Sequence, residues 1–260
     1  MSKLTIIPAR DVEAGGDTDE APRRVVGRAA IRTFAPAGYP LWMSDVELAD
    51  ATSIEWDAVH GDEAVYVFRG AVDVDGRRCP AGGAFVVESG VVATATAMGP
   101  TRIMHFGSVD AGMVDGGLLG APRADGHGVH VVGPAGVFES GQLEGVRATW
   151  FADGTCEACR CQLFEVTAPV TSDRDGKAHS HSEDEIIYLL EGSISMGAHT
   201  LEPFTALFVP ADVRYALGGS GGHRFLNFRR NVSEQVYTRG SAPQLETARA
   251  RGGRRTNDIC

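Results

Sequence analysis

The stretch EIIYLLEGSISMGAHTLEPFTALFVPADVR (Glu185–Arg214) decides the fold, because the chain contains a second version of it. The earlier version, EAVYVFRGAVDVDGRRCPAGGAFVVESGVV (Glu63–Val92), lies 122 residues before it and aligns without a gap. Tyr66 falls on Tyr188 in this alignment, and a glycine follows four residues later in both copies. Two copies of one structural unit are the simplest explanation of such a repeat.

Within each copy, apolar residues come in short runs that are separated by turn-forming residues. The first copy contains AVYVF, GAFVV and RIMHF, and the second contains IIYLL, TALFV and RFLNF. Runs of about four to seven apolar residues between such breaks are typical of strands. The 33 glycines of the chain also suit many tight turns. We therefore predict an all-β protein of two tandem modules with few short helices.

The boundaries of the modules follow from composition. Residues 111–127 are rich in glycine, as is typical of a linker. We expect an N-terminal module over residues 1–110 and a C-terminal module over residues 128–238. The final stretch, 239–260, contains five arginines and no apolar periodicity, which predicts a flexible tail.

Composition also limits the partners and the location of the protein. A chain with 43% hydrophobic and 22% charged residues is typical of a globular protein. The net charge of −10 argues against binding to nucleic acid or to an anionic membrane. The charged N-terminus and the lack of a long apolar run predict neither a signal peptide nor a membrane span. Five cysteines, an odd number, then favour reduced thiols in the cytoplasm.

The second copy begins with a pattern of metal-ligating residues. His179, His181 and Glu185 all have odd numbers, and side chains of equal parity share one face of a strand. Two imidazoles and a carboxylate on one face suit a divalent transition metal. A surface His-x-His in a loop is the alternative, but the glutamate and Gly192 at fixed spacing favour a metal site.

These residues resemble the first motif of the cupin superfamily, which consists of a glycine, His-x-His, a glutamate and a closing glycine. The resemblance extends to Phe208–Tyr215, which is similar to the second cupin motif and contains its proline. It implies a bicupin, with two tandem jelly-roll β-barrels and a homodimer. It also implies metal binding by His179, His181 and Glu185.

The sequence departs from the family at Tyr215, where the motif usually has a fourth ligand, a histidine. Two interpretations stay open. The phenol of Tyr215 can act at the metal, as a ligand or as a proton donor. Alternatively, Tyr215 is a tyrosine of the barrel wall. In both cases a metal with two histidines and one carboxylate keeps open coordination positions, as in non-haem Fe(II) oxygenases.

The first copy lacks the motif. Asp57 stands in place of His179 and Val59 in place of His181, so that only Glu63 is retained. We therefore expect an N-terminal barrel without metal ligands that has a structural role and supplies dimer surface.

The leading functional hypothesis is a non-haem iron dioxygenase, in which Fe(II) and O2 act on a small metabolite that is aromatic or contains a thiol. The second hypothesis is a redox-neutral hydrolase, lyase or isomerase with Mn, Zn or Ni, resembling ureidoglycine aminohydrolase. The third is a bicupin that binds a ligand without catalysis.

The remaining cysteines and histidines carry weaker expectations. Cys156, Cys159 and Cys161 form C-x2-C-x-C, and we interpret them as reduced cysteines of a strand rather than as a second metal site. His130, at the end of the linker, has no evident partner in the sequence. Asn227 is a candidate pocket residue.

Overall fold

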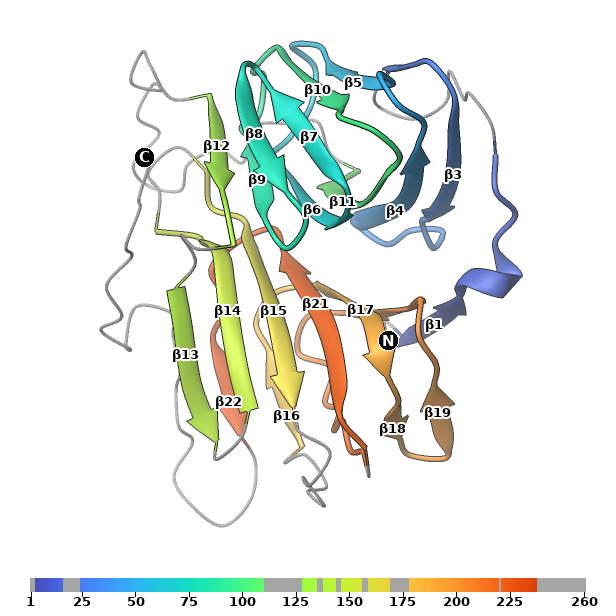
Figure 1. Cartoon of the computed structure of the whole chain (residues 1–260). Coiled ribbons are helices and arrows are strands. Elements are labelled where there is room, and N and C mark those ends of the chain that lie inside the picture. Colours follow the sequence, from blue (N-terminus) through green and yellow to red (C-terminus); the bar gives the residue numbers. More distant parts are fainter. Residues whose placement is uncertain are drawn as a thin grey trace. The chain divides into compact units, whose positions relative to one another are not determined.

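The computed structural model consists of strands that are built from these short apolar runs (Figure 1). It describes residues 3–15, 24–109, 128–134, 138–143, 146–155, 159–168, 178–219 and 221–237. The only helix in this part of the chain is a short 3-10 turn, η1 (Ala9–Asp11), and so it holds no helix long and apolar enough to cross a membrane. The predicted linker, 111–127, and the predicted tail, 239–260, lie outside the described residues.

The described residues form two compact units. The N-terminal unit contains residues from 13–137 and 156–160, and the C-terminal unit contains residues from 1–12, 138–155 and 161–254. Each unit has one large antiparallel sheet, in accordance with the all-β prediction.

The N-terminal unit has two sheets. The six-stranded sheet has the order β12-β9-β6-β11-β4-β3, and the five-stranded sheet has the order β2-β5-β10-β7-β8. Their bounds are β2 (Arg24–Val26), β3 (Ala29–Phe34), β4 (Leu41–Leu48), β5 (Ser53–Trp56), β6 (Glu63–Arg69), β7 (Ala71–Val74), β8 (Arg77–Pro80), β9 (Ala84–Val87), β10 (Ala93–Ala97), β11 (Thr101–Ser108) and β12 (Val129–Val132).

The C-terminal unit has a seven-stranded sheet of the order β1-β20-β17-β21-β15-β14-β13, together with the pairs β16-β22 and β18-β19. The bounds are β1 (Thr5–Pro8), β13 (Phe138–Leu143), β14 (Val146–Asp153), β15 (Gln162–Ala168), β16 (His179–His181), β17 (Glu185–Gly192), β18 (Ile194–Met196), β19 (His199–Leu201), β20 (Thr205–Val209), β21 (His223–Arg229) and β22 (Gln235–Tyr237).

The strand register confirms the repeat. Glu63 pairs with Val87 across β6 and β9, and Glu185 pairs with Val209 across β17 and β20, so both partners shift by the same 122 residues. The pairing of β11 with β6 recurs 122 residues later as the pairing of β21 with β17. Both pairings contain a shift of register at equivalent residues. The repeat in sequence is therefore a repeat of three central strands with their hydrogen-bond register.

A glycine at the end of the first of these strands is required in both units. Gly70 has a φ of +84° and Gly192 a φ of +76°, a region that side chains disfavour. A Cβ atom on Gly192 would also lie 1.9 Å from the carbonyl oxygen of Gly222. This close approach explains why the closing glycine of the motif occurs twice.

The division into units differs from the predicted boundaries at two places. Val129–Val132, expected to open the C-terminal module, pairs with β9 of the N-terminal unit. Thr5–Pro8, at the start of the chain, pairs with β20 of the C-terminal unit. The choice of a sheet edge depends on long-range pairing that a local pattern does not contain.

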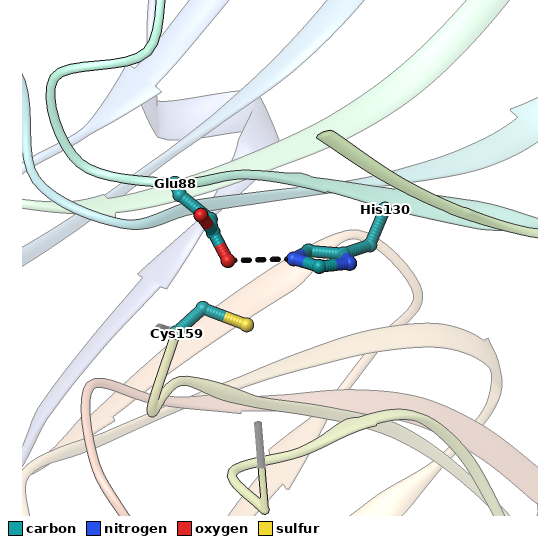
Figure 2. A group of neighbouring side chains, drawn as sticks. All are labelled: Glu88, His130 and Cys159. Carbon is teal, nitrogen blue, oxygen red and sulfur yellow. Dashed lines mark hydrogen bonds and ion pairs between the residues drawn. The ribbon is translucent and has the colours of Figure 1, made fainter. Parts of the chain in front are cut away.

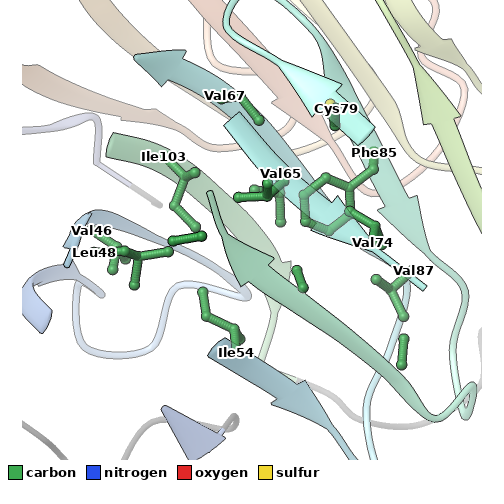
Figure 3. Packing of buried hydrophobic residues seen from close by; sticks show 14 of the residues in the cluster. Val46, Leu48, Ile54, Val65, Val67, Val74, Cys79, Phe85, Val87 and Ile103 are labelled. Atoms are coloured by element: carbon green, nitrogen blue, oxygen red, sulfur yellow. The ribbon is translucent and has the colours of Figure 1, made fainter. Parts of the chain in front are cut away.

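The core of the N-terminal unit lies between its two sheets (Figure 3). Val65, Val67 and Phe85 of the six-stranded sheet pack with Ile54 and Val74 of the five-stranded sheet, and all five are almost fully buried. Since alternate residues share a face, Glu63 on β6 points the same way as Val65. In the C-terminal unit, Ile187 and Leu189 are core residues, which places Glu185 on the inner face of β17.

Candidate functional site in the C-terminal unit

The two histidines of the predicted site lie on β16, which forms backbone hydrogen bonds along both of its edges. On one side β16 pairs with β22, where His181 faces Gln235. On the other side, the backbones of His179 and Tyr215 exchange hydrogen bonds of 2.9 and 3.0 Å. The segment after Pro210 therefore brings Tyr215 beside the histidines.

The structure brings the predicted residues together. The rings of His179 and His181 have their centroids 5.0 Å apart, and the ring of Tyr215 lies 4.6 Å from that of His179. His181 Nε2 lies 3.9 Å from Glu185 Oε1. His181, Glu185 and Tyr215 are buried, while His179 is partly exposed.

Hydrogen-bond donors surround the carboxylate of Glu185. The hydroxyl of Tyr215 donates to Oε1 through a short hydrogen bond. Oε2 accepts from Asn227 Nδ2 at 2.8 Å and from Arg229 Nε and Nη2 at 3.1 and 2.9 Å. Tyr215 thus contacts the candidate ligand itself, beyond any packing role in the barrel wall.

These donors favour the ionised form of the Glu185 carboxyl group. Burial alone would raise the pKa of this carboxyl, but Arg229, His181 and the hydrogen bonds from Tyr215 and Asn227 outweigh it and lower the pKa to about 2. Glu185 is therefore ionised at neutral pH although it is fully buried.

His181 is held neutral beside it. Burial is the largest cause, and together with the positive charge of Arg229 it lowers the pKa of His181 to about 3, against the opposing effect of Glu185. Since a guanidinium has only donors, His181 Nε2 accepts the 3.0 Å hydrogen bond from Arg229 Nη2, and the proton lies on Nδ1. That Nδ1 atom is buried without a hydrogen-bond partner among the described residues.

The donor types, two imidazoles and a carboxylate, suit a divalent metal. Metal ligands must be deprotonated, and here an ionised carboxylate and the lone pair of a neutral imidazole face each other. Arg229 already places a positive charge between them, at 3.0 Å from His181 Nε2 and 2.9 Å from Glu185 Oε2. A metal held by His179, His181 and Glu185 would therefore require the guanidinium to turn away from Nε2.

Arg229 is a residue of the candidate site that the sequence analysis did not single out. It pairs directly with Glu185 across β21 and β17, so both side chains point into the same interior. Its guanidinium also lies 5.3 Å from the centroid of the Phe164 ring. The alternation of apolar residues in RFLNFR could have placed Asn227 and Arg229 on the inner face.

Solved structures resemble the chain over most of its length. A variant of oxalate decarboxylase from Bacillus subtilis matches with a TM-score of 0.64 and 14% identity, over 91% of this chain and 80% of that chain. The formate complex of oxalate decarboxylase from Lactobacillus farciminis matches with a TM-score of 0.65 and 13% identity, over 91% and 89%. This chain has the cupin jelly-roll fold.

A third cupin neighbour is the putative glyoxylate-induced protein from Pseudomonas aeruginosa. Its TM-score is 0.57 at 14% identity, over 93% of this chain and 92% of that chain. The sequence matches no family model and no curated protein. The likeness concerns the fold, and it confirms the fold class that was predicted from the repeat.

The equivalent place in the N-terminal cupin unit is built differently. Glu63, which corresponds to Glu185, binds Trp56 Nε1 and His105 Nε2, each at 2.7 Å. The ring of His105 also packs edge-on against Trp56, with centroids 5.5 Å apart. Asp57 is exposed, and its carboxylate accepts a hydrogen bond from the backbone N–H of Val59. The carboxylate of Glu63 thus binds a tryptophan and a histidine, whereas that of Glu185 binds a tyrosine, an asparagine and an arginine.

The structure differs from the expectations for two of the cysteines and for His130. Cys159 and Cys161 are buried but precede β15, so neither belongs to a strand as was expected. His130, which seemed to lack a partner, lies 2.7 Å from Glu88 through its Nε2 atom. Cys156 lies outside the described residues.

Proposed function

We propose that the protein is a metal-dependent enzyme of the cupin superfamily that acts on a small carboxylate-bearing metabolite. His179, His181 and Glu185 would hold one divalent metal, and Arg229 and Tyr215 would act on the substrate. The observation that carries the proposal is the buried, ionised Glu185 beside a neutral His181, whose Nε2 lone pair already accepts a hydrogen bond from the cation Arg229. Such a pair attracts a cation and has no evident structural purpose in an apolar barrel.

The neighbours support a metal and a small carboxylate. The oxalate decarboxylase of Bacillus subtilis has Mn(II) centres. The structure of the Lactobacillus farciminis enzyme is a complex with formate. Mn(II) accepts imidazole and carboxylate ligands, as does Fe(II). We therefore propose Mn(II) or Fe(II) as the resident metal.

Arg229 supplies the recognition of a carboxylate. A guanidinium binds a carboxylate through two parallel hydrogen bonds, and burial strengthens the attraction because little water competes. Once a cation neutralises Glu185, Arg229 can direct these donors to an anionic substrate in the same pocket. The aromatic face of Phe164 fixes the plane of the guanidinium on its other side.

Tyr215 is the proposed proton donor. Its hydroxyl already donates to Glu185, so it lies within reach of a substrate bound beside that carboxylate. A bound divalent metal would polarise the substrate carboxylate and facilitate loss of the phenolic proton. Asn227, which donates to Glu185 Oε2, keeps the carboxylate oriented during this step.

The non-haem iron dioxygenase remains a second candidate. It is favoured by the number of protein ligands, because two histidines and one carboxylate leave coordination positions for both O2 and substrate. Oxygen consumption coupled to substrate loss would support this candidate, whereas equal turnover under nitrogen would support a redox-neutral lyase or hydrolase.

The test is metal content together with turnover. The purified chain, His181→Ala and the control His199→Ala, which alters an exposed histidine, are loaded with Mn(II) or Fe(II) and analysed for bound metal. We expect His181→Ala to lose one metal per chain and the control to lose none, since one of three ligands is removed. Small mono- and dicarboxylates are then screened for turnover. Equal metal content in the three proteins would refute the site, and metal binding without turnover of any carboxylate would favour a binding protein.

A further inference from the structure

A second group of metal-ligating side chains lies in the N-terminal unit, away from any cupin motif. Glu88 directly follows β9, His130 lies on β12, and Cys159 precedes β15 (Figure 2). Their ligand atoms all lie within 4.8 Å of one another, and all three residues are buried. His130 Nε2 and Glu88 Oε1 are 2.7 Å apart, and Figure 2 shows the sulfur of Cys159 beside this hydrogen bond.

The backbone fixes all three positions. The register of β12 with β9 pairs His130 with Val86, and the N–H of Glu88 donates to Gly128 at 3.0 Å, so Glu88 and His130 are neighbours on one sheet. The position of Cys159 is fixed by Asp62. Its carboxylate accepts from the N–H of Ser89 at 2.8 Å and from that of Arg160 at 3.3 Å, thereby linking the residue after Glu88 to the residue after Cys159.

We propose that Glu88, His130 and Cys159 bind a Zn²⁺ ion. Thiolate, imidazole and carboxylate are the three side-chain ligands that zinc uses, and the sulfur disfavours Mg²⁺ and Ca²⁺. Without the metal, a proton lies between Glu88 and His130 at the 2.7 Å contact. Zinc at about 2.0–2.3 Å from each ligand takes the place of this proton, and a water molecule completes a tetrahedron.

Small movements suffice to close the site. Ligands of a tetrahedral zinc ion lie about 3.3–3.7 Å apart, given the usual bond lengths. The Glu88–His130 contact would open by less than about 1 Å and the contacts to sulfur would shorten by about 1 Å at most. The zinc ion would then tie Cys159 to β9 and β12, which makes it a structural ion that stabilises the N-terminal unit. This site is independent of the metal proposed at Glu185.

Co(II) is a suitable probe because a cysteine ligand to Co(II) produces a sulfur-to-metal charge-transfer band. The full chain is stripped of metal, loaded with Co(II), and titrated with Zn²⁺ to displace it. We expect the band in the parent chain and in the control Cys161→Ala, which removes a buried thiol outside the cluster. We expect no band in Cys159→Ser, and a zinc affinity at least about 100-fold lower in His130→Gln.

Further variants separate this site from the proposed active site. The charge-transfer band should persist in His181→Ala, which alters the other unit. Asp62→Asn, which retains the shape of the positioning residue, should weaken zinc about 10- to 100-fold without abolishing the band. A band that persists in Cys159→Ser, or a parent chain without the band, would overturn the proposal, and neither result would affect the site at Glu185.

Discussion

Replacing Arg229 with methionine removes the cation from a buried ion pair while keeping a side chain of similar length. The side chain of Arg229 is 8% exposed and that of Glu185 is not exposed, so water cannot replace the lost donors. Removing one partner of such a pair costs about 3–5 kcal/mol, because an uncompensated charge stays buried.

Arg224→Met is the matched control, since Arg224 lies on the same strand and also binds glutamates. Its side chain is 26% exposed and contacts Glu191, which is 62% exposed. Surface pairs of this kind contribute about 0–1 kcal/mol. Urea denaturation of the metal-free proteins, followed by far-ultraviolet circular dichroism, should therefore show a large loss for Arg229→Met and a small loss for Arg224→Met.

The pH dependence of the loss tests its cause. In the parent chain, the folded pKa of Glu185 lies below its usual value, so its stabilisation is complete above pH 4.5 and is lost as pH falls toward 2. Without Arg229, burial is left as the largest influence and raises the pKa, so the variant should lose stability as pH rises through the raised value. Adding Mn(II) should restore part of the loss, because the metal supplies the missing positive charge. A loss below about 1 kcal/mol, or one with the same pH dependence as the parent, would refute this account of Glu185.

The other predictions concern one tyrosine and one turn. Tyr215→Phe should lower turnover about 100- to 10,000-fold at unchanged metal content if the hydroxyl transfers a proton. Loss of its hydrogen bond should also raise the pKa of Glu185. A variant with full turnover would show that the hydroxyl of Tyr215 transfers no proton. Gly192→Ala should destabilise the chain by more than about 2 kcal/mol in urea denaturation, because its Cβ atom would meet the Gly222 carbonyl. Gly197→Ala, with a φ of +57° but open space around it, should cost only about 1 kcal/mol, and equal losses would contradict the steric explanation.

Local patterns in the sequence were sufficient for the strands and for three candidate ligands. The repeat of Glu63–Val92 in Glu185–Arg214 predicted equivalent strands, and their register agrees with it pair by pair. Parity predicted that His179, His181 and Glu185 share one face of a strand, but the histidines lie on β16 and Glu185 on β17, in different sheets. Their proximity therefore depends on the tertiary structure and not on alternation along one strand. The role of these residues as metal ligands stays a prediction.

Pairing between distant strands decided the rest, because no local pattern states which edge a strand will join. The segment Val129–Val132 could be recognised as a strand, but only the tertiary structure places it beside β9 and so brings His130 to Glu88. Likewise, Arg229 is a terminal residue of an apolar run in the sequence, and the pairing of β21 with β17 makes it the partner of Glu185. Alternation is a property of the single strand, whereas partners, charges and pKa values arise from contacts between residues that are far apart in the chain.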